Sequence, residues 1–348
     1  MRSERYIPII KTTDAEIKGY QKLSDHVKKS ILPLFELTRS RPVKGFPSGD
    51  IHRRMAQLRE YTNGNPFLLD ITKHEDLSNP QIDALLDDTN GFQEWRVFLD
   101  RYSDLQVIPM LHLYPDDLEN FKLFVELTSK KFKAYAFRIG LETTAEELDI
   151  YLEELTKVLD VKDRLIVVID AEYVHEKNID ESKIDISSLV DKCLARSIKH
   201  ISVNSSSFPS SVKSRIGGGD KEGVMKILEL DLFQYLNLKH DSRVIFYGDY
   251  AGIHPIRLTI AGGNWVPRVD QTTNDDYIYK RFRRDDGGYV TAAREIVVWN
   301  KFLKIDCWGY DQIIKASEGL PEGKSPAFWI SVRLNQHITM MSLKFSPV

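Results

Sequence analysis

Short apolar runs alternate with longer amphipathic stretches along the first 250 residues of the chain. The apolar runs are nearly continuous, which is typical of strands that are buried on both faces. They predict eight strands: Tyr6–Lys11, Ile31–Leu37, Pro66–Thr72, Val107–Leu113, Tyr135–Leu141, Leu165–Ala171, His200–Ser206 and Val244–Tyr250. Helical patterns follow at Asp14–Ser30, Asp116–Phe132, Thr144–Leu159, Ser182–Ser197 and Lys221–Leu238.

This alternation predicts an α/β fold, a (β/α)₈ barrel of the TIM type. The strand ends recur about every 34 residues, a spacing that fits one strand followed by one helix. Parallel strands need such crossovers, and eight of them close without leaving an edge. A doubly wound open sheet is the alternative, but it favours a glycine-rich phosphate turn after the first strand. The segment KTTDAE at 11–16 contains no glycine.

The pattern changes after the eighth strand. Residues 251–290 are rich in Gly, Asp, Thr and Tyr and predict a long loop, or lid. Two helical patterns, Val290–Leu303 and Ser325–Leu343, predict that residues 290–348 complete or cap the barrel. We therefore expect residues 1–348 to form one barrel domain, with a second extended connection at Arg39–Gly49.

Composition is that of a folded cytoplasmic protein. The hydrophobic fraction is 42% and the charged fraction 28%. Two distant cysteines, Cys193 and Cys307, favour neither a disulfide framework nor a structural zinc site. No apolar run is long enough to span a membrane. The net charge of −3 disfavours general nucleic-acid binding but leaves room for a local basic patch.

Each predicted strand runs into a polar residue at its C-terminal end. The eight residues are Lys11, Glu36, Asp70, His112, Arg138, Asp170, Asn204 and Asp249. In a closed barrel these ends share one mouth, where barrel enzymes carry their chemistry. A strand end in solvent is the plain alternative for each residue. The prediction also depends on side-chain alternation, because a shift of one residue turns a side chain outward.

The types of these residues suggest separate roles. Clustered carboxylates raise each other's pKa unless cations intervene. Lys11 and Arg138 could neutralise them, or hold a substrate phosphate together with Asn204. Mg²⁺ or Mn²⁺ could also bind among the carboxylates, at Glu36, Asp70 and Asp170. Catalytic roles are predicted for Glu36, Asp70, His112, Asp170 and Asp249, with His112 as the group that moves a proton.

A basic and aromatic segment, Tyr277–Arg284, offers further cations. It contains Lys280, Arg281, Arg283 and Arg284 between aromatic residues, and Arg268 precedes it. The segment could be a lid that binds a phosphate or nucleotide, or a nucleic-acid contact. A solvated loop balanced by neighbouring aspartates is the alternative.

Several short motifs together resemble the "beta protein" family of phages, prophages and bacterial genomic islands. They are YIPIIK at 6–11, LPLFE at 32–36, FRI at 137–139, GDYxxIHP at 248–255 and NQHIT at 335–339. The resemblance implies a barrel-like fold and a mobile-element or phage-defence setting, and it supplies no reaction. It also makes His254 and His337 candidate site residues.

Two hypotheses of different class follow. The first is a phage-conflict enzyme that hydrolyses or transfers a group on a phosphate-bearing small molecule, nucleotide or nucleic-acid end. The second is a non-catalytic sensor of a phage-defence system that uses the same pocket to bind a ligand or a protein from a neighbouring gene. Fold alone does not separate them.

Overall fold

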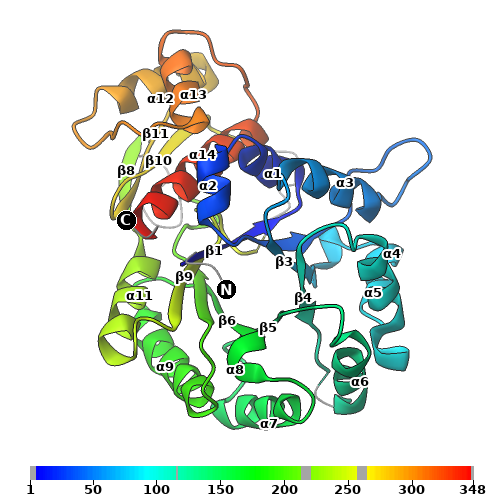
Figure 1. Cartoon of the computed structure of the whole chain (residues 1–348). Helices are drawn as coiled ribbons and strands as arrows, with labels where there is room; N and C mark the ends of the chain where they lie inside the picture. Colours follow the sequence, from blue (N-terminus) through cyan, green and yellow to red (C-terminus); the bar gives the residue numbers. More distant parts are fainter. Residues whose placement is uncertain (1–4, 115–116, 213–220, 257–264, 346–348) are drawn as a thin grey trace.

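Eight parallel strands close into a barrel in the computed structural model, which describes residues 5–114, 117–212, 221–256 and 265–345 (Figure 1). The strands follow the chain around the barrel, and the eighth pairs with the first. They are β1 (Tyr6–Lys11), β2 (Leu34–Leu37), β3 (Phe67–Ile71), β4 (Val107–Leu111), β5 (Tyr135–Gly140), β6 (Leu165–Tyr173), β7 (Ile201–Ser206) and β9 (Ile245–Asp249). The predicted fold class is confirmed, and the open-sheet alternative is wrong.

Helices connect the strands around the outside of the barrel. They are α1 (Asp14–Gln21), α2 (Asp25–Ser30), α3 (Ile51–Tyr61), α4 (Pro80–Leu85), α5 (Thr89–Arg101), α6 (Leu118–Thr128), α7 (Ala145–Thr156), α8 (Val161–Arg164), α9 (Ile179–Ala195) and α11 (Leu228–Lys239). The helix predicted over Asp14–Ser30 is two helices, because Ser24 caps a new one by accepting a hydrogen bond from Val27 N. A capping box at Thr144 starts α7 as its sequence predicts.

Side-chain alternation along the strands divides the core into two layers. One set of apolar side chains packs inside the barrel: Ile7, Ile9, Leu34, Leu68, Met110, Ala136, Ile166, Val168 and Tyr250. Their neighbours along each strand, such as Tyr6, Ile10 and Phe35, pack outward in the cluster that includes the helices. Every second strand residue therefore faces the barrel axis, and the last such residue of each strand reaches the C-terminal end, here called the mouth.

The C-terminal helix α14 (Pro326–Phe345) packs on the barrel beside α1 and β1 (Figure 1). Leu334, Ile338 and Met341 join the core between strands and helices. Asn335 Nδ2 donates a hydrogen bond of 3.1 Å to the carbonyl of Gly19 in α1. Gly19 permits this approach, because a Cβ there would lie 2.7 Å from Leu334 Cδ2. The helix thus covers the strand pair that closes the barrel.

Three strands outside the barrel form an antiparallel sheet in the order β10-β11-β8. They are β8 (Glu222–Lys226), β10 (Arg268–Thr272) and β11 (Asp276–Arg281). One face packs against α12 (Gly288–Val297), α13 (Trp308–Ser317) and α14 through the cluster that contains Val269 and Ile278. The other face places Tyr277 and Tyr279 in the core of the barrel.

This sheet corrects three predictions. Residues 251–290 are not one loop, because β10 and β11 lie within them. The predicted helix Lys221–Leu238 begins only at Leu228, after β8. The segment Tyr277–Arg284 is mostly strand rather than lid, since its alternating aromatic residues suit a pleated, half-buried surface.

None of the helices in the described ranges combines the length and apolar character that crossing a bilayer requires.

Candidate functional site

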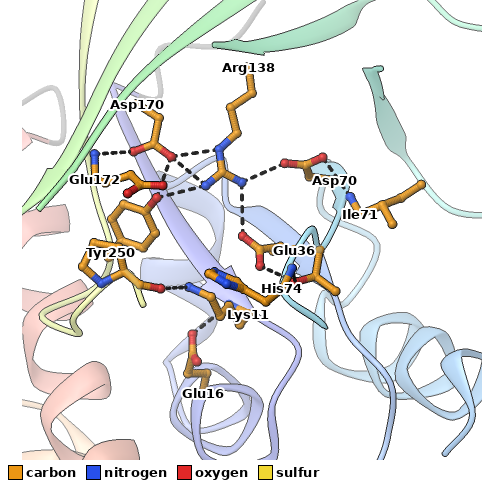
Figure 2. Close-up of polar contacts among 12 residues, drawn as sticks. Lys11, Glu16, Glu36, Asp70, Ile71, His74, Arg138, Asp170, Glu172 and Tyr250 are labelled. Atoms are coloured by element: carbon orange, nitrogen blue, oxygen red, sulfur yellow. Dashed lines mark hydrogen bonds and ion pairs between the residues drawn. The ribbon is translucent and has the colours of Figure 1, made fainter. Parts of the chain in front are cut away.

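One guanidinium group gathers three carboxylates at the barrel mouth (Figure 2). Arg138 at the end of β5 contacts Glu36 Oε2 of β2 at 3.1 Å and Asp70 Oδ2 of β3 at 2.8 Å through Nη1. Its Nη2 lies 2.6 Å from Asp170 Oδ2 of β6. Each of these four residues follows an inward-facing apolar residue by two positions, so alternation points all four into the mouth.

Every donor of the Arg138 guanidinium has a partner. Nε donates to Asp170 Oδ2 at 2.9 Å, and Nη1 serves Glu36 and Asp70. Nη2 donates to Asp170 and, at 2.9 Å, to the hydroxyl of Tyr250. Because a guanidinium carries five N–H groups, Arg138 has none left for a ligand.

The carboxylates are equally well supplied with donors. Their second oxygens accept hydrogen bonds from Thr72 Oγ1 (to Glu36, 2.9 Å), Ile71 N (to Asp70, 2.8 Å) and Glu172 N (to Asp170, 2.9 Å). Burial opposes ionisation of Glu36, but Lys11, Arg138 and the hydrogen bond from Thr72 prevail and lower its pKa to about 2. Glu36 is therefore ionised at neutral pH, held in place by charge and hydrogen bonds.

Lys11 adds a second cation beside this network. Its side chain is buried, and Nζ donates a hydrogen bond of 2.6 Å to the carbonyl of Pro255. The ammonium lies 5.0 Å from the centre of the Tyr250 ring. Glu16 Oε2 accepts a hydrogen bond of 2.7 Å from the backbone of Lys11. Burial raises the pKa of Glu16 to about 6, although the charge of Lys11 opposes this.

His112 follows β4 and is buried at the rim of the mouth. Its ring centre lies 5.8 Å from that of Trp95 and 6.1 Å from that of Phe92, both in α5. Burial lowers the pKa of His112 to about 4, although the charge of Asp70 acts in the opposite direction. The imidazole is therefore neutral at pH 7. Within the described residues its Nε2 has no hydrogen-bond partner, so it keeps an unused site for a proton.

Asp249 does not join the ring, contrary to the sequence-based prediction. It is fully buried, with Oδ2 2.7 Å from His337 Nε2 and Oδ1 accepting from Tyr6 OH at 2.8 Å. Its neighbour Tyr250 belongs to the cluster inside the barrel. Alternation therefore turns Asp249 outward, against α14, and brings the Tyr250 hydroxyl into the mouth in its place.

His337 is correspondingly a structural contact between α14 and the barrel. It is fully buried, and its Nδ1 lies 3.1 Å from Thr272 Oγ1 of β10. The ring stacks on Tyr277 at 5.6 Å. Neither His337 nor Asp249 touches the residues gathered by Arg138.

Asn204 and His254 also lie apart from the Arg138 network. Asn204 is fully buried in the barrel, accepts from Ser202 Oγ at 2.6 Å and donates to the carbonyl of Ile7 at 2.8 Å. Gly248 faces it so closely that a Cβ there would lie 2.3 Å from the Asn204 amide. His254 is half-buried, with Nδ1 3.0 Å from the carbonyl of Ile256 and its ring 4.7 Å from that of Tyr173.

The basic residues near the C-terminus divide among different surfaces. Lys280 pairs with Glu222 and lies 4.5 Å from the centre of the Trp299 ring. Arg283 and Arg284 are exposed, and Arg284 lies over Trp265. Arg268 and Arg281 face each other across β10 and β11. The structure brings none of these five residues into contact with Arg138.

Two residues of the site, and one buried arginine outside it, were missed from the sequence. Tyr250 and Thr72 complete the hydrogen bonds of the network. Arg333 on α14 is buried beside β10 and pairs with Asp270 at 2.8 Å. Tyr250 could have been found from the sequence, because residues two apart along a strand face the same side and Gly248 faces inward. Arg333 is a lone arginine in a helical pattern and gives no such signal.

The three carboxylates predicted as metal ligands surround Arg138 instead of an open centre. Within the described ranges, no group of three or more His, Cys, Asp or Glu side chains is arranged to hold a metal ion. The proposed Mg²⁺ or Mn²⁺ therefore stays a prediction from the sequence.

Comparisons with known proteins point to one family. A family model described as Beta protein matches residues 6–342. Protein beta of Enterobacteria phage P4 is 30% identical over 341 residues, which cover 96% of this chain and 91% of the phage protein.

Two solved structures are more distantly similar. They are a carboxyl transferase domain of Rhizobium etli pyruvate carboxylase with pyruvate (9% identity, TM-score 0.37, 97% of this chain and 48% of that chain) and the Bacillus megaterium spore cortex-lytic enzyme SleL (10% identity, TM-score 0.35, 95% and 74%). The chain thus spans about half the length of the first. Scores this low bear on neither site nor function.

Proposed function

This chain belongs to the Beta protein family, and we propose that its barrel mouth is the active site of an enzyme acting on a small phosphate-bearing molecule. The observation that carries the proposal is the Arg138 network. Four buried or half-buried ionic side chains from four strands meet at the end of the barrel that carries the chemistry of TIM-barrel enzymes.

Stability alone is a poor reason for such a network. Removing several charges from water costs free energy that their mutual attraction often only offsets, and apolar side chains of similar volume would fill the same space as well. Ionic groups at this position are therefore better explained by chemistry. Their complete hydrogen bonding supports a site that is organised before substrate arrives.

The residues divide the work between them. Glu36, Asp70 and Asp170 are held by Arg138 and supply a fixed negative field rather than mobile protons. His112 is neutral, and its Nε2 is without a partner among the described residues, so it is the group that accepts a proton from the substrate. Lys11 stabilises developing negative charge. Arg138 acts as a positioning residue, because its donors are all in use.

The biological setting proposed is conflict between phages and their hosts. It rests on the family, since the 30%-identical relative is a phage protein. In that setting a barrel enzyme would modify a nucleotide, a related phosphate-bearing metabolite or a nucleic-acid end by hydrolysis or group transfer.

A second candidate is a sensor that binds the same ligand without changing it. The full occupation of the carboxylate oxygens favours it, because acids held in this way have little freedom to exchange protons. The ligand would then be read by a protein partner encoded nearby.

One experiment separates the two functions. The protein is incubated with nucleoside mono-, di- and triphosphates and sugar phosphates, and conversion is followed by ³¹P nuclear magnetic resonance. For an enzyme, His112→Gln should lower kcat at least about 100-fold while changing ligand affinity by less than about threefold. His26→Gln, on the exposed surface of α2, is the matched control.

Two outcomes count against the active site. If both His112→Gln and Glu36→Gln keep the turnover of the wild type, the barrel mouth is not the active site. If the wild type binds the ligand without converting it, and both variants bind it more weakly, the protein is a sensor rather than an enzyme.

A further inference from the structure

Two arginine side chains share one carboxylate beside the barrel mouth. Arg333 of α14 lies 2.8 Å from Asp270 Oδ2 through Nη1, and Arg268 of β10 lies 2.7 Å from Asp270 Oδ1 through Nε. Asp270 and Arg333 are nine-tenths or more buried, at 4% and 5% exposure. One carboxylate therefore serves two guanidinium groups in a space with little water.

Arg281 adds a third positive charge to the same face. It is directly opposite Arg268 in the antiparallel pair of β10 and β11, and opposite residues of such a pair point to the same side of the sheet. Arg281 is only 8% exposed. Within the described part of the chain, its side chain has no hydrogen bond or ion pair.

The charges of this cluster do not balance. Three guanidinium groups and one carboxylate leave two positive charges, and like charges directly opposite each other destabilise a strand pair. A buried charge without a partner is costly. Among the described residues the cluster keeps two uncompensated positive charges, and Arg281 has no partner at all, so the cluster is organised for an anion that supplies the missing negative charge.

The cluster lies next to the end of the barrel that holds the Arg138 network. Arg333 Nε donates a hydrogen bond of 2.9 Å to the carbonyl of Gly252, two residues after Tyr250. The Cα atoms of Tyr250 and Gly252 are therefore at most about 7.6 Å apart. Phe208, just after β7, lies under both guanidinium groups, 3.9 Å from that of Arg333 and 5.4 Å from that of Arg268.

Phe208 and Gly252 lie in the loops after the seventh and eighth strands of the barrel, β7 and β9. In TIM barrels the loops after these two strands frequently form a phosphate site. We infer that Arg268, Arg281 and Arg333 bind the phosphomonoester group of the substrate. The inference deepens the proposed function, since it names where the phosphate lies when Arg138 has no donor to offer.

A phosphomonoester fits the cluster by charge and by geometry. It carries between 1.5 and 2 negative charges near pH 7, roughly the two that the cluster lacks. Guanidinium groups bind phosphate oxygens through paired N–H donors. Arg281 offers all of its donors, while Asp270 fixes the orientation of Arg268 and Arg333.

Inorganic phosphate and AMP are suitable probes of this site. Titration calorimetry and thermal unfolding of the full chain are carried out with each probe against chloride at matched ionic strength. We expect both probes to bind the wild type and raise its melting temperature. Arg281→Gln should bind each at least about tenfold more weakly. Without ligand it should unfold at a higher temperature than the wild type, because an unpaired charge has been removed.

The matched control is Arg53→Gln, an exposed arginine of α3 with the same change of charge. It should bind and unfold as the wild type does. Arg281→Lys keeps the charge but not the paired donors, so its affinity should fall between those of the wild type and Arg281→Gln.

Three results would overturn the inference. They are a wild type that responds to neither probe, an Arg281→Gln variant that binds as tightly as the wild type, and an Arg281→Gln variant that is less stable without ligand. The last would make Arg281 a structural group.

Glu36→Gln separates this inference from the proposed function. It should keep phosphate affinity within about twofold while losing turnover. If Glu36→Gln keeps its turnover and also binds phosphate normally, the catalytic role of the mouth is refuted and the phosphate site is not. If Glu36→Gln loses turnover but the wild type does not bind phosphate, the phosphate site alone is refuted.

Discussion

Arg138 is the residue that holds the barrel mouth together. Its side chain is 19% exposed, and it contacts carboxylates whose side chains are exposed by no more than 6%. Without it, three nearly buried negative charges would face each other, with the charge of Lys11 acting on Glu36. The arrangement of the mouth is therefore expected to depend on this one guanidinium.

Arg138→Met should lower the free energy of unfolding by about 3–5 kcal/mol, the loss typical of removing one partner from a buried ionic group. Urea unfolding at pH 7 measures it. Arg138→Lys should recover only part of the loss, because one ammonium cannot serve three carboxylates in fixed directions. Arg59→Met, which breaks an exposed pair with Asp104, is the control and should cost much less, because solvent screens an exposed pair. Equal losses in the two Met variants would contradict the account.

Glu16 should make stability depend on pH. Burial raises its pKa from 4.5 to about 6, so the folded state binds the proton more tightly than the unfolded state. The resulting stabilisation is complete below pH 4.5 and is lost as the pH rises to 6, by about 2 kcal/mol in total. Glu16→Gln should remove this component from urea unfolding curves across that window. The exposed Glu119→Gln should leave it in place, and an unchanged profile in Glu16→Gln would rule out the assignment.

Sequence reasoning identified most of the mouth at the level of residues. The sequence correctly placed five residues at the strand ends that meet in the mouth: Lys11, Glu36, Asp70, Arg138 and Asp170. Asp249 was wrong by one position, because the strand beginning near Val244 contains no polar–apolar contrast that fixes which residues face inward. The side chain of Tyr250 is an apolar ring with one hydroxyl, so its residue type alone does not tell whether it belongs to the core or to the site.

At the scale of elements, the contact between α1 and α14 closes the helical layer of the barrel. Gly19→Ala would place a methyl group 2.7 Å from Leu334 Cδ2 and 2.8 Å from the Ser331 carbonyl. We expect a loss of about 1–3 kcal/mol in unfolding free energy from this overpacking.

A double-mutant cycle tests whether the contact is the cause. Leu334→Ala creates space for the added methyl group, so Gly19→Ala combined with Leu334→Ala should be less destabilising than the sum of the two single changes. Additive losses would mean that α14 does not pack on Gly19 as described.

The strands of the barrel were predictable because both of their faces are buried and their sequences are nearly continuous apolar runs. The small sheet was not. The segment before β10 is rich in glycine and polar residues, and β8 has a glycine within EGVMK, so local pattern favoured a loop and a helix. Its strands exist because they pair with one another and bury Tyr277 and Tyr279 against the barrel, which is tertiary information.

At the scale of the whole molecule, the basic run near residue 280 does not form a continuous charged stripe. Lys280 and Arg281 point to opposite faces of the sheet, and each is less than 10% exposed. The chain carries a net charge of −3. We therefore expect no general nucleic-acid binding at physiological salt.

Fluorescence anisotropy with labelled single- and double-stranded DNA of random sequence measures this. The dissociation constant should stay weaker than about 10⁻⁴ M at 150 mM salt. Binding in the micromolar range that falls steeply with salt, and is lost in Arg283→Gln/Arg284→Gln, would restore the basic segment as a nucleic-acid contact.

The central claim is that the fold brings strand-end residues from distant parts of the chain into one network around Arg138. A crystal structure determined at pH 7 from a phosphate-containing solution tests it most directly. We expect the Arg138 guanidinium within hydrogen-bond distance of Glu36, Asp70 and Asp170, with phosphate density at Arg268, Arg281 and Arg333. Carboxylates turned away from Arg138, or phosphate bound to Arg138 itself, would contradict it.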